Sequence, residues 1–365
     1  MEVRLVIPYN PLEEVGGLEI STVRFAVELK KVGISTQIVT KGVSGTINGI
    51  SVVGFPTFTR LCQYLITTAD DYDVLHWLEI FPDKGEVETQ GMTSGLIKKL
   101  GKTVIFMVAT SGNLTNRGSG VLVTPLLKEV ANHYIVSNPA QIEEFGRFGF
   151  HRNIHNIGFG IDTANEFYPV AAEEKAMIRE RLGLPIDKVL CFFIGRFVER
   201  KRPDFLLESW LELEDIYTQA QFIVVGSGMN QDDSIEDKVL SLAKVCRNID
   251  FRDVTPHAHL YYKACDILLL PSSREGQPNV LMEAMACGNA VIGSDIPGIQ
   301  ELLIDGMTGK TFPVNGKEEF KTAIRQLVQS AELRESLGCQ ARLAISEARS
   351  IKVVTQQYVD LYTRR

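Results

Sequence analysis

Residues 265–313 read CDILLLPSSREGQPNVLMEAMACGNAVIGSDIPGIQELLIDGMTGKTFP, and this stretch decides the fold class. It opens with a short apolar run at 266–272 and continues into a segment of helical periodicity at 280–288 that closes on a glycine. A second apolar run follows at 289–294. Strand, helix and strand in this order, with a glycine as helix stop, indicate one unit of a parallel sheet covered by helices.

The same alternation of apolar runs and helical patterns extends along the whole chain. Further strands are predicted at 4–9, 36–40, 73–78, 103–108, 133–137, 153–160, 189–195, 221–226 and 249–253. Polar residues at 163–182 separate two such series, so the fold class is α/β with two doubly wound, Rossmann-like domains. We place the domains at 1–165 and 170–347, facing a central cleft, and expect the helix at 348–365 to pack back on the first domain.

Size and composition support a two-domain globular protein. The chain has 365 residues, of which 45% are hydrophobic and 23% charged, and its formal net charge is −7. A chain of this length exceeds one ordinary domain. The acidic balance argues against nucleic acid as a partner.

No stretch of the sequence approaches the roughly 20 apolar residues that span a bilayer. The six cysteines are scattered without metal-ligand spacing, as expected of small core residues in a reducing compartment. We therefore expect a cytoplasmic protein, and peripheral contact with the inner face of the membrane stays open.

Two glutamates eight positions apart, Glu275 and Glu283, mark the first candidate site. Glu275 follows a predicted strand, whereas Glu283 lies inside the helix that Asn279 opens. The start of a helix presents backbone N–H groups and a positive dipole end, which suit a diphosphate. One carboxylate is then placed to face a sugar and the other to reach a ribose. The alternative is an N-terminal glutamate that only stabilises the helix.

A second candidate site is the basic loop at 195–202, GRFVERKR, which follows another predicted strand. Arg196 offers a forked donor to phosphate oxygens and Lys201 a point charge. Such charges neutralise a departing diphosphate. The alternative is a solvated basic loop.

A third and weaker candidate is the glycine pair Gly16–Gly17, which follows the first predicted strand. Paired glycines that open a helix let the backbone approach a phosphate or a sugar closely. Without the other two motifs, a plain loop would be the better interpretation.

With these motifs the chain resembles retaining GT-B glycosyltransferases of glycosyltransferase family 4. The resemblance covers nearly the whole chain and is strongest over 188–314. It rests on GGLE at 16–19, the basic loop at 195–202 and the block at 265–313. The segment IHNIGFGID at 154–162 also looks like the family's, although Phe159 replaces a commoner asparagine.

The resemblance implies a role for each candidate. Glu275 would contact the hydroxyls of the donor sugar and support an oxocarbenium-like transition state, and Glu283 would bind the ribose. Arg196 and Lys201 would bind the diphosphate and stabilise it as the leaving group. Other residues would complete that cradle: Asn279, Val280, Gly16 and Gly17. The resemblance also implies that no metal ion and no cofactor is needed.

One departure from the family concerns a histidine that many members carry after the fourth strand of the first domain. Here that region reads ATS, Ala109–Thr110–Ser111. Either Thr110 or Ser111 serves the site, or the donor sugar is handled differently, or the enzyme is weakened. His76 is expected at the same edge of the cleft as a sugar or acceptor contact, with a structural role as the alternative.

The sequence therefore predicts a hexosyltransferase that moves a sugar from a nucleotide-diphosphate sugar to a glycan or glycolipid with retention, in polysaccharide or lipopolysaccharide synthesis. Two alternatives stay open: a non-catalytic nucleotide-sugar-binding subunit of the same fold, and a nucleotide-sugar 2-epimerase. The nucleotide base, the sugar and the acceptor carry no signature in the sequence.

Overall fold

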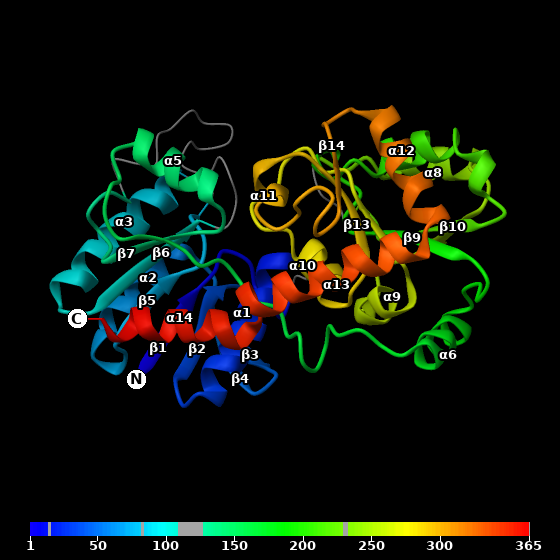
Figure 1. Cartoon of the computed structure of the whole chain (residues 1–365). Helices are drawn as coiled ribbons and strands as arrows, with labels where there is room; N and C mark the ends of the chain where they lie inside the picture. Colours follow the sequence, from blue (N-terminus) through cyan, green and yellow to red (C-terminus); the bar gives the residue numbers. More distant parts are fainter. Residues whose placement is uncertain (14–15, 82–83, 109–126, 229–232, 365) are drawn as a thin grey trace. The chain divides into compact units, whose positions relative to one another are not determined.

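The chain folds into two compact units in the computed structural model (Figure 1). The structure describes residues 1–13, 16–81, 84–108, 127–228 and 233–364. The first unit comprises Met1–Gly160 together with Ile351–Arg365, and the second comprises Ile161–Ser350. The two units are described separately below.

The first unit is built on a sheet of eight strands in the described residues, in the order β3-β4-β2-β1-β5-β6-β7-β8. The strands are β1 (Glu2–Val6), β2 (Ser35–Lys41), β3 (Gly45–Ile47), β4 (Ile50–Phe55), β5 (Val74–Trp77), β6 (Thr103–Val108), β7 (His133–Val136) and β8 (Ile154–Asn156). The β3–β4 pair is antiparallel and the other described pairs are parallel.

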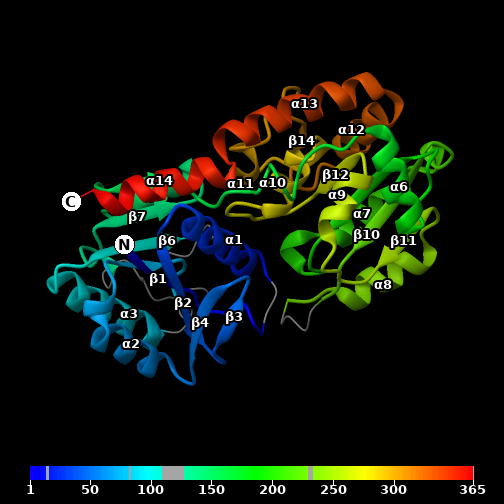
Figure 2. The ribbon, with the colours of Figure 1, turned by 90° about the horizontal axis from the view of Figure 1, so that it is seen from below.

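Helices cover both faces of this sheet, and its central strands β1, β5, β6 and β7 are accordingly buried almost continuously. They are α1 (Gly17–Lys31), α2 (Phe58–Thr67), η1 (Ala69–Asp71), α3 (Lys84–Lys99), α5 (Pro139–Arg147) and α14 (Ile351–Thr363). Along β6, Val104 and Phe106 pack into the core beneath α2 and α3, whereas Ile105 and Met107 pack into the core beneath α1 and α14. Figure 2 shows the strands between α14 on one side and α2 and α3 on the other.

The hairpin of β3 and β4 was absent from the predicted elements. Its turn is Asn48–Gly49, whose φ angles of 49° and 74° are both left-handed. Asn-Gly is the preferred pair for such a turn, so the signal was present in the sequence. The strands themselves are exposed or half-buried along much of their length. β4 reads ISVVGF, which is as apolar as the predicted run TQIVT at 36–40, so the composition of β4 does not explain why it was not predicted.

The second unit is built on a parallel sheet of six strands in the described residues, in the order β11-β10-β9-β12-β13-β14. The strands are β9 (Val189–Ile194), β10 (Ala220–Val225), β11 (Ile249–Arg252), β12 (Ile267–Leu270), β13 (Ala290–Ser294) and β14 (Lys310–Phe312). Its central strands are buried on both faces, which explains the continuous apolar runs read from the sequence.

Helices again lie on both faces of the sheet. They are α6 (Ala172–Leu182), η2 (Glu199–Lys201), α7 (Pro203–Trp210), η3 (Glu214–Ile216), α8 (Glu236–Val245), α9 (Ala258–Ala264), α10 (Asn279–Ala286), α11 (Pro297–Gln300), α12 (Lys317–Gln329) and α13 (Ala331–Ala348). One core packs beneath α9, α10 and α13 and the other beneath α7, α8 and α12. The predicted α/β class with two doubly wound sheets is confirmed. Within the described ranges, no helix is both long enough and apolar enough to cross a bilayer.

Candidate functional site

The candidate site of the second unit lies where the connections of its sheet reverse direction. Strands β9 and β12 are neighbours, but the chain continues from β9 to β10 on one side and from β12 to β13 on the other. Open parallel sheets bind ligands at such a point, outside the carboxyl ends of the strands. The loops that follow these strands are 195–202 and 271–278. They carry the basic motif and the first paired glutamate.

The two loops are held together by their backbones. The backbone N–H of Ser273 donates to the carbonyl oxygen of Arg200 at 2.8 Å, and the Ser273 hydroxyl donates to the same oxygen at 3.3 Å. The neighbouring strand also comes close, because a Cβ on Gly226 would lie 1.9 Å from the carbonyl oxygen of Gly195. Gly226 has a φ of 147°, so both its conformation and its surroundings require glycine.

Glu275 pairs with two cations of the basic loop. Its Oε1 lies 2.6 Å from Nζ of Lys201, and its Oε2 lies 3.2 Å from Nη1 of Arg200. The side chains of Glu275 and Lys201 are 7% and 12% exposed. Because paired buried charges need precise partners, these contacts fix the position of the carboxylate.

The electrostatics of this cluster favour an ionised carboxylate. Burial alone would raise the pKa of Glu275, but the charges of Lys201 and Arg200 outweigh burial and lower it. Burial lowers the pKa of Lys201, and Arg200 and Arg196 lower it further against the opposing effect of Glu275. Two basic side chains thus act on one carboxylate, and the cluster carries an excess of positive charge. Such an excess suits an anionic ligand.

Helix α10 carries the second glutamate. Asn279 is its first residue, and Glu283, its fifth, is 8% exposed. Glu275 precedes the helix in the loop, as predicted. The positive end of the helix dipole therefore lies between the two carboxylates, with Asn279 and Val280 in the first turn.

Helix α11 packs against the backbone of the loop that carries Glu275. A Cβ on Gly298 would lie 2.3 Å from the carbonyl oxygen of Glu275 and 2.6 Å from that of Gly276. The backbone of α11 therefore packs directly on the loop. This contact was not predicted, because the glycine that permits it lies more than twenty residues along the chain.

Arg200 and Arg202 are the residues of the basic loop that the sequence reasoning left without a role. Arg200 holds Glu275, as described above. Arg202 has a left-handed φ of 54°, and its guanidinium lies 4.8 Å from the ring centroid of Phe205 and donates to Oδ1 of Asn315. These contacts hold a turn that glycine would adopt more readily. Both arginines stand in the quoted motif, but only the folded chain shows their partners.

Gly16 and Gly17 belong to the first unit. Gly16 precedes α1 with a φ of −135°, and Gly17 is the first residue of the helix. A Cβ on Gly16 would lie 2.3 Å from Oε2 of Glu19, which is 5% exposed. The carboxylate of Glu19 thus folds back on the start of α1, where a negative charge is favourable. A role of the two glycines toward a donor stays a prediction.

His76 does not lie on a ligand-accessible surface, which corrects its expected place as a sugar or acceptor contact. It stands on β5 with no exposed surface, and its Nδ1 lies 2.8 Å from the hydroxyl of Tyr362. Its ring also packs against Phe25 and Tyr358. Burial lowers its pKa to about 3, so the imidazole is neutral. The physical reason is that α14 covers this face of the sheet and encloses the ring.

Ala109, Thr110 and Ser111 lie outside the described residues.

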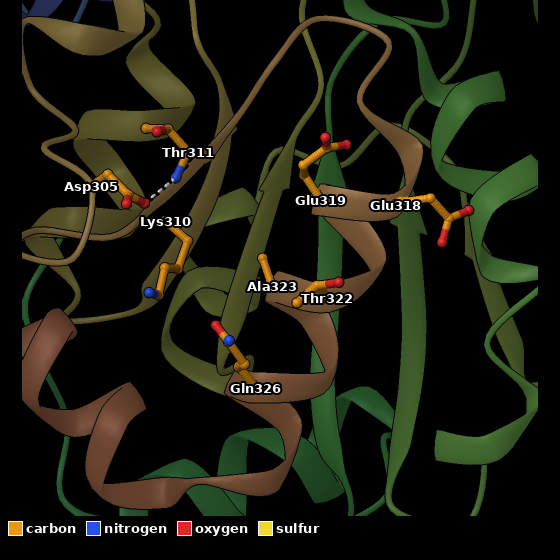
Figure 3. A pocket seen from close by; sticks show the side chains of 8 residues that line it. All are labelled: Asp305, Lys310, Thr311, Glu318, Glu319, Thr322, Ala323 and Gln326. Carbon is orange, nitrogen blue, oxygen red and sulfur yellow. Dashed lines mark hydrogen bonds between the residues drawn. The ribbon is translucent and has the colours of Figure 1, made fainter.

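A hollow of about 330 Å³ elsewhere in the second unit is chemically unlike the candidate site. It lies between β14 and α12, as Figure 3 shows. Its lining residues are Asp305, Lys310, Thr311, Glu318, Glu319, Thr322, Ala323 and Gln326. Carboxylates outnumber the single lysine there, so the hollow does not suit a diphosphate.

Comparison with known proteins points to the same unit. Residues 188–330 match the family model of the glycosyl transferases group 1. The matched range contains both loops of the candidate site and the whole of α10. The D-inositol 3-phosphate glycosyltransferase of Xylanimonas cellulosilytica is 30% identical to the chain over 192 residues. That alignment covers 51% of this chain, and the chain spans 45% of the relative's length.

Solved structures resemble the whole chain. Sucrose-phosphate synthase from Thermosynechococcus elongatus superposes with a TM-score of 0.79 at 20% identity, covering 99% of this chain and 98% of that one. Anabaena HepE in complex with UDP-glucose superposes with a TM-score of 0.81 at 16% identity, covering 99% of each chain. These likenesses confirm the predicted GT-B fold.

Proposed function

We propose that the protein transfers a hexose-type sugar from a nucleotide-diphosphate sugar to a hydroxyl group of a glycan or glycolipid, with retention of the anomeric configuration. The observation that carries the proposal is the cluster of Arg200, Lys201 and Glu275 at the reversal point of the second sheet. It joins a buried, oriented carboxylate to an excess of cations, which are the groups that a sugar and a diphosphate require.

Arg196 and Lys201 are proposed to bind the diphosphate of the donor. Arg200 and Lys201 together outweigh the single charge of Glu275, and Arg196 adds positive charge that acts on Lys201. The diphosphate diester of a nucleotide sugar is doubly negative and suits this excess. Arg196 supplies a fork for two phosphate oxygens and Lys201 a point charge. Gly16, Gly17, Asn279 and Val280 are proposed to add backbone N–H groups.

Glu275 is proposed to accept hydrogen bonds from hydroxyls of the donor sugar, and Glu283 from the ribose. As the bond between the anomeric carbon and the diphosphate breaks, negative charge grows on the diphosphate, and Arg196 and Lys201 stabilise it. Positive charge grows on the sugar ring, and the ionised Glu275 stabilises that charge. The acceptor oxygen forms the new bond to the anomeric carbon, and its proton leaves with the nucleoside diphosphate.

The reaction is proposed to need neither a metal ion nor a cofactor. A divalent cation would neutralise the departing diphosphate, and the positive charges of Arg196 and Lys201 would do so in its place. This part of the proposal is tested by chelation, as described in the Discussion.

Peripheral contact with an anionic membrane is proposed for the first unit, through the outer side of α3. Met92 and Leu96 on α3, and Leu100 just after it, are 77%, 43% and 52% exposed. Residues four apart share one side of a helix. The side chain of Lys99 is also exposed, and Lys102 follows closely. Apolar side chains flanked by lysines suit the interface of an anionic bilayer.

Ligand-dependent thermal stability followed by product analysis tests the function. UDP, GDP and their hexose conjugates are added singly, with UDP-glucose first because HepE is described in complex with it. A binding ligand raises the unfolding midpoint. Release of the nucleoside diphosphate from the stabilising donor identifies a transferase, whereas stabilisation without turnover identifies a binding subunit. Conversion of the donor into its 2-epimer identifies the epimerase, and no stabilisation by any nucleotide would refute all three.

A further inference from the structure

The first sheet has a reversal point of its own, formed by β1 and β5. The two strands are neighbours, and the chain continues from β1 to β2 on one side and from β5 to β6 on the other. Leu78 N–H donates to the carbonyl oxygen of Val6 at 2.9 Å, so their pairing extends just beyond the end of β5. The rule that places ligands at the reversal point of the second sheet applies equally here.

Glu79 occupies this point. It is the second residue after β5, and at 7% exposure it is as buried as Glu275. The N–H of Ile80 donates to its Oε1 at 2.9 Å, and the Nε2 of Gln90 donates to its backbone carbonyl at 3.2 Å. Both contacts fix the residue at the edge of the sheet. Glu79 and Glu275 hold corresponding places in the two sheets. Glu79 lies in the loop after β5, and Glu275 lies in the loop after β12, and each of these strands is one of the pair at the reversal point of its sheet.

The chemistry around Glu79 favours hydroxyl groups as ligands. Asn10 follows β1, which is next to β5, and Ser137 and Asn138 follow β7, which lies on the other side of β5 beyond β6. All three are buried and uncharged. Tyr9, after β1, exposes 44% of its surface. A carboxylate that accepts hydrogen bonds, at a sheet edge where β1 and β7 are followed by neutral polar groups and β1 also by an exposed aromatic ring, suits a sugar or another polyol. The negative charge of Glu79 disfavours a phosphate at this place.

We propose that Glu79 is an acceptor-binding residue whose carboxylate accepts hydrogen bonds from hydroxyls of the acceptor at the reversal point of the first sheet. The inference rests on the proposed function, because it assigns the acceptor of that reaction. The inference also goes beyond the proposed function, because neither the sequence motifs nor the matched range 188–330 includes Glu79.

Binding of simple polyols, measured by saturation-transfer NMR, tests the assignment without requiring turnover. The probes are methyl α-glucoside, methyl α-mannoside, methyl α-galactoside and myo-inositol, each with and without UDP. Glu79→Gln retains an oxygen that can accept from Ile80 N–H, and Glu79→Ala removes it. Glu28→Gln is the matched control, because Glu28 is a buried carboxylate of the same unit that pairs with Lys31.

We expect at least one probe to bind the wild type and the control equally, and to bind both Glu79 variants about tenfold more weakly, as for loss of one charged hydrogen bond. UDP binding stays unchanged in all variants. Equal probe binding by wild type and Glu79→Ala would overturn the inference, and so would the absence of probe binding to the wild type. Absence of UDP binding throughout would instead overturn the proposed donor site, even if a probe binds through Glu79.

Discussion

Nζ of Lys201 lies 2.6 Å from Oε1 of Glu275, and both side chains are almost completely buried. The lysine belongs to the loop after β9 and the glutamate to the loop after β12, so this contact joins the two halves of the candidate site. A ligand with a diphosphate would compete with Glu275 for the same ammonium group. Donor binding and the position of the carboxylate are thereby coupled.

Replacing Lys201 or Arg196 by alanine should lower turnover far more than it weakens donor binding. The lost charge matters most as the leaving group develops, and a single such donor accounts for about 10²–10³ in rate. Donor-saturation kinetics on Lys201→Ala and Arg196→Ala measure the effect. Lys321→Ala is the control. Lys321 lies on α12, away from the site, and pairs with Glu318 of the same helix and with Glu212. Turnover within about twofold of wild type in both site variants would show that the basic loop has no role in the reaction.

Glu275 and Glu283 should differ in their kinetic roles. Glu275→Gln should mainly lower kcat, because its charge acts on the transition state, whereas Glu283→Gln should mainly raise the donor KM. Glu212→Gln is a matched control, since Glu212 also pairs with two cations, Lys317 and Lys321, but is exposed. A fall in kcat confined to Glu283→Gln would reverse the two roles. NMR of the product linkage tests retention, and an inverted anomer would exclude it.

Chelation should leave the transfer reaction intact. In the proposed reaction, Arg196, Lys201 and the start of α10 would supply the positive charge that a divalent ion would otherwise provide. The rate of nucleoside diphosphate release is measured after dialysis against EDTA and again after addition of Mg²⁺ or Mn²⁺. A rate lost with EDTA and restored by either ion would contradict the proposal.

His76 should make the first unit sensitive to acid without affecting the reaction. Its pKa is lowered to about 3 by burial, against about 6.5 in the unfolded chain. The unfolded chain therefore binds a proton between these values that the folded chain does not, and stability is lost as the pH falls from about 6.5 toward 3. His76→Phe should show a shallower fall of the unfolding free energy over this range and near-normal kcat. The same slope in both proteins would contradict the assignment.

Membrane contact through α3 should depend on its apolar side chains. Met92→Glu combined with Leu96→Glu should abolish cosedimentation with vesicles that contain phosphatidylglycerol, because charge on the inserted side opposes burial in the interface. Leu343→Glu is the control, since Leu343 is comparably exposed on α13 in the second unit. Undiminished cosedimentation of the double variant would place any membrane contact elsewhere.

Much of the second unit could be predicted because its sheet is parallel and buried on both faces. Apolar runs such as 266–272 locate its strands, and ligand loops follow strands at a known edge. Glu275, Arg196 and Lys201 could therefore be placed in loops that each follow a strand, whereas the adjacency of the two loops is known only from the strand order. The resemblance to a family then supplied their proposed roles, which periodicity alone could not.

The rest depended on contacts between distant parts of the chain. The pairing of Arg200 with Glu275 spans 75 positions. His76 was expected at a ligand edge because its strand could be recognised, whereas the helix that buries it lies 286 positions away at its contact with Tyr362. Glu79 lies only three positions after that histidine, yet only the strand order shows that it follows the strand at the reversal point.

Helix α14 has a consequence for the order in which the protein is made. Val354, Tyr358, Leu361 and Tyr362 belong to the same core as Val3 and Phe25. All residues of the second unit precede this helix in the chain, so synthesis passes through that unit before the helix is made. The first unit, although most of it is synthesised earlier, must wait with one face of its sheet covered by α1 but not yet by α14. During that interval, the growing chain exposes an apolar surface that the finished protein hides.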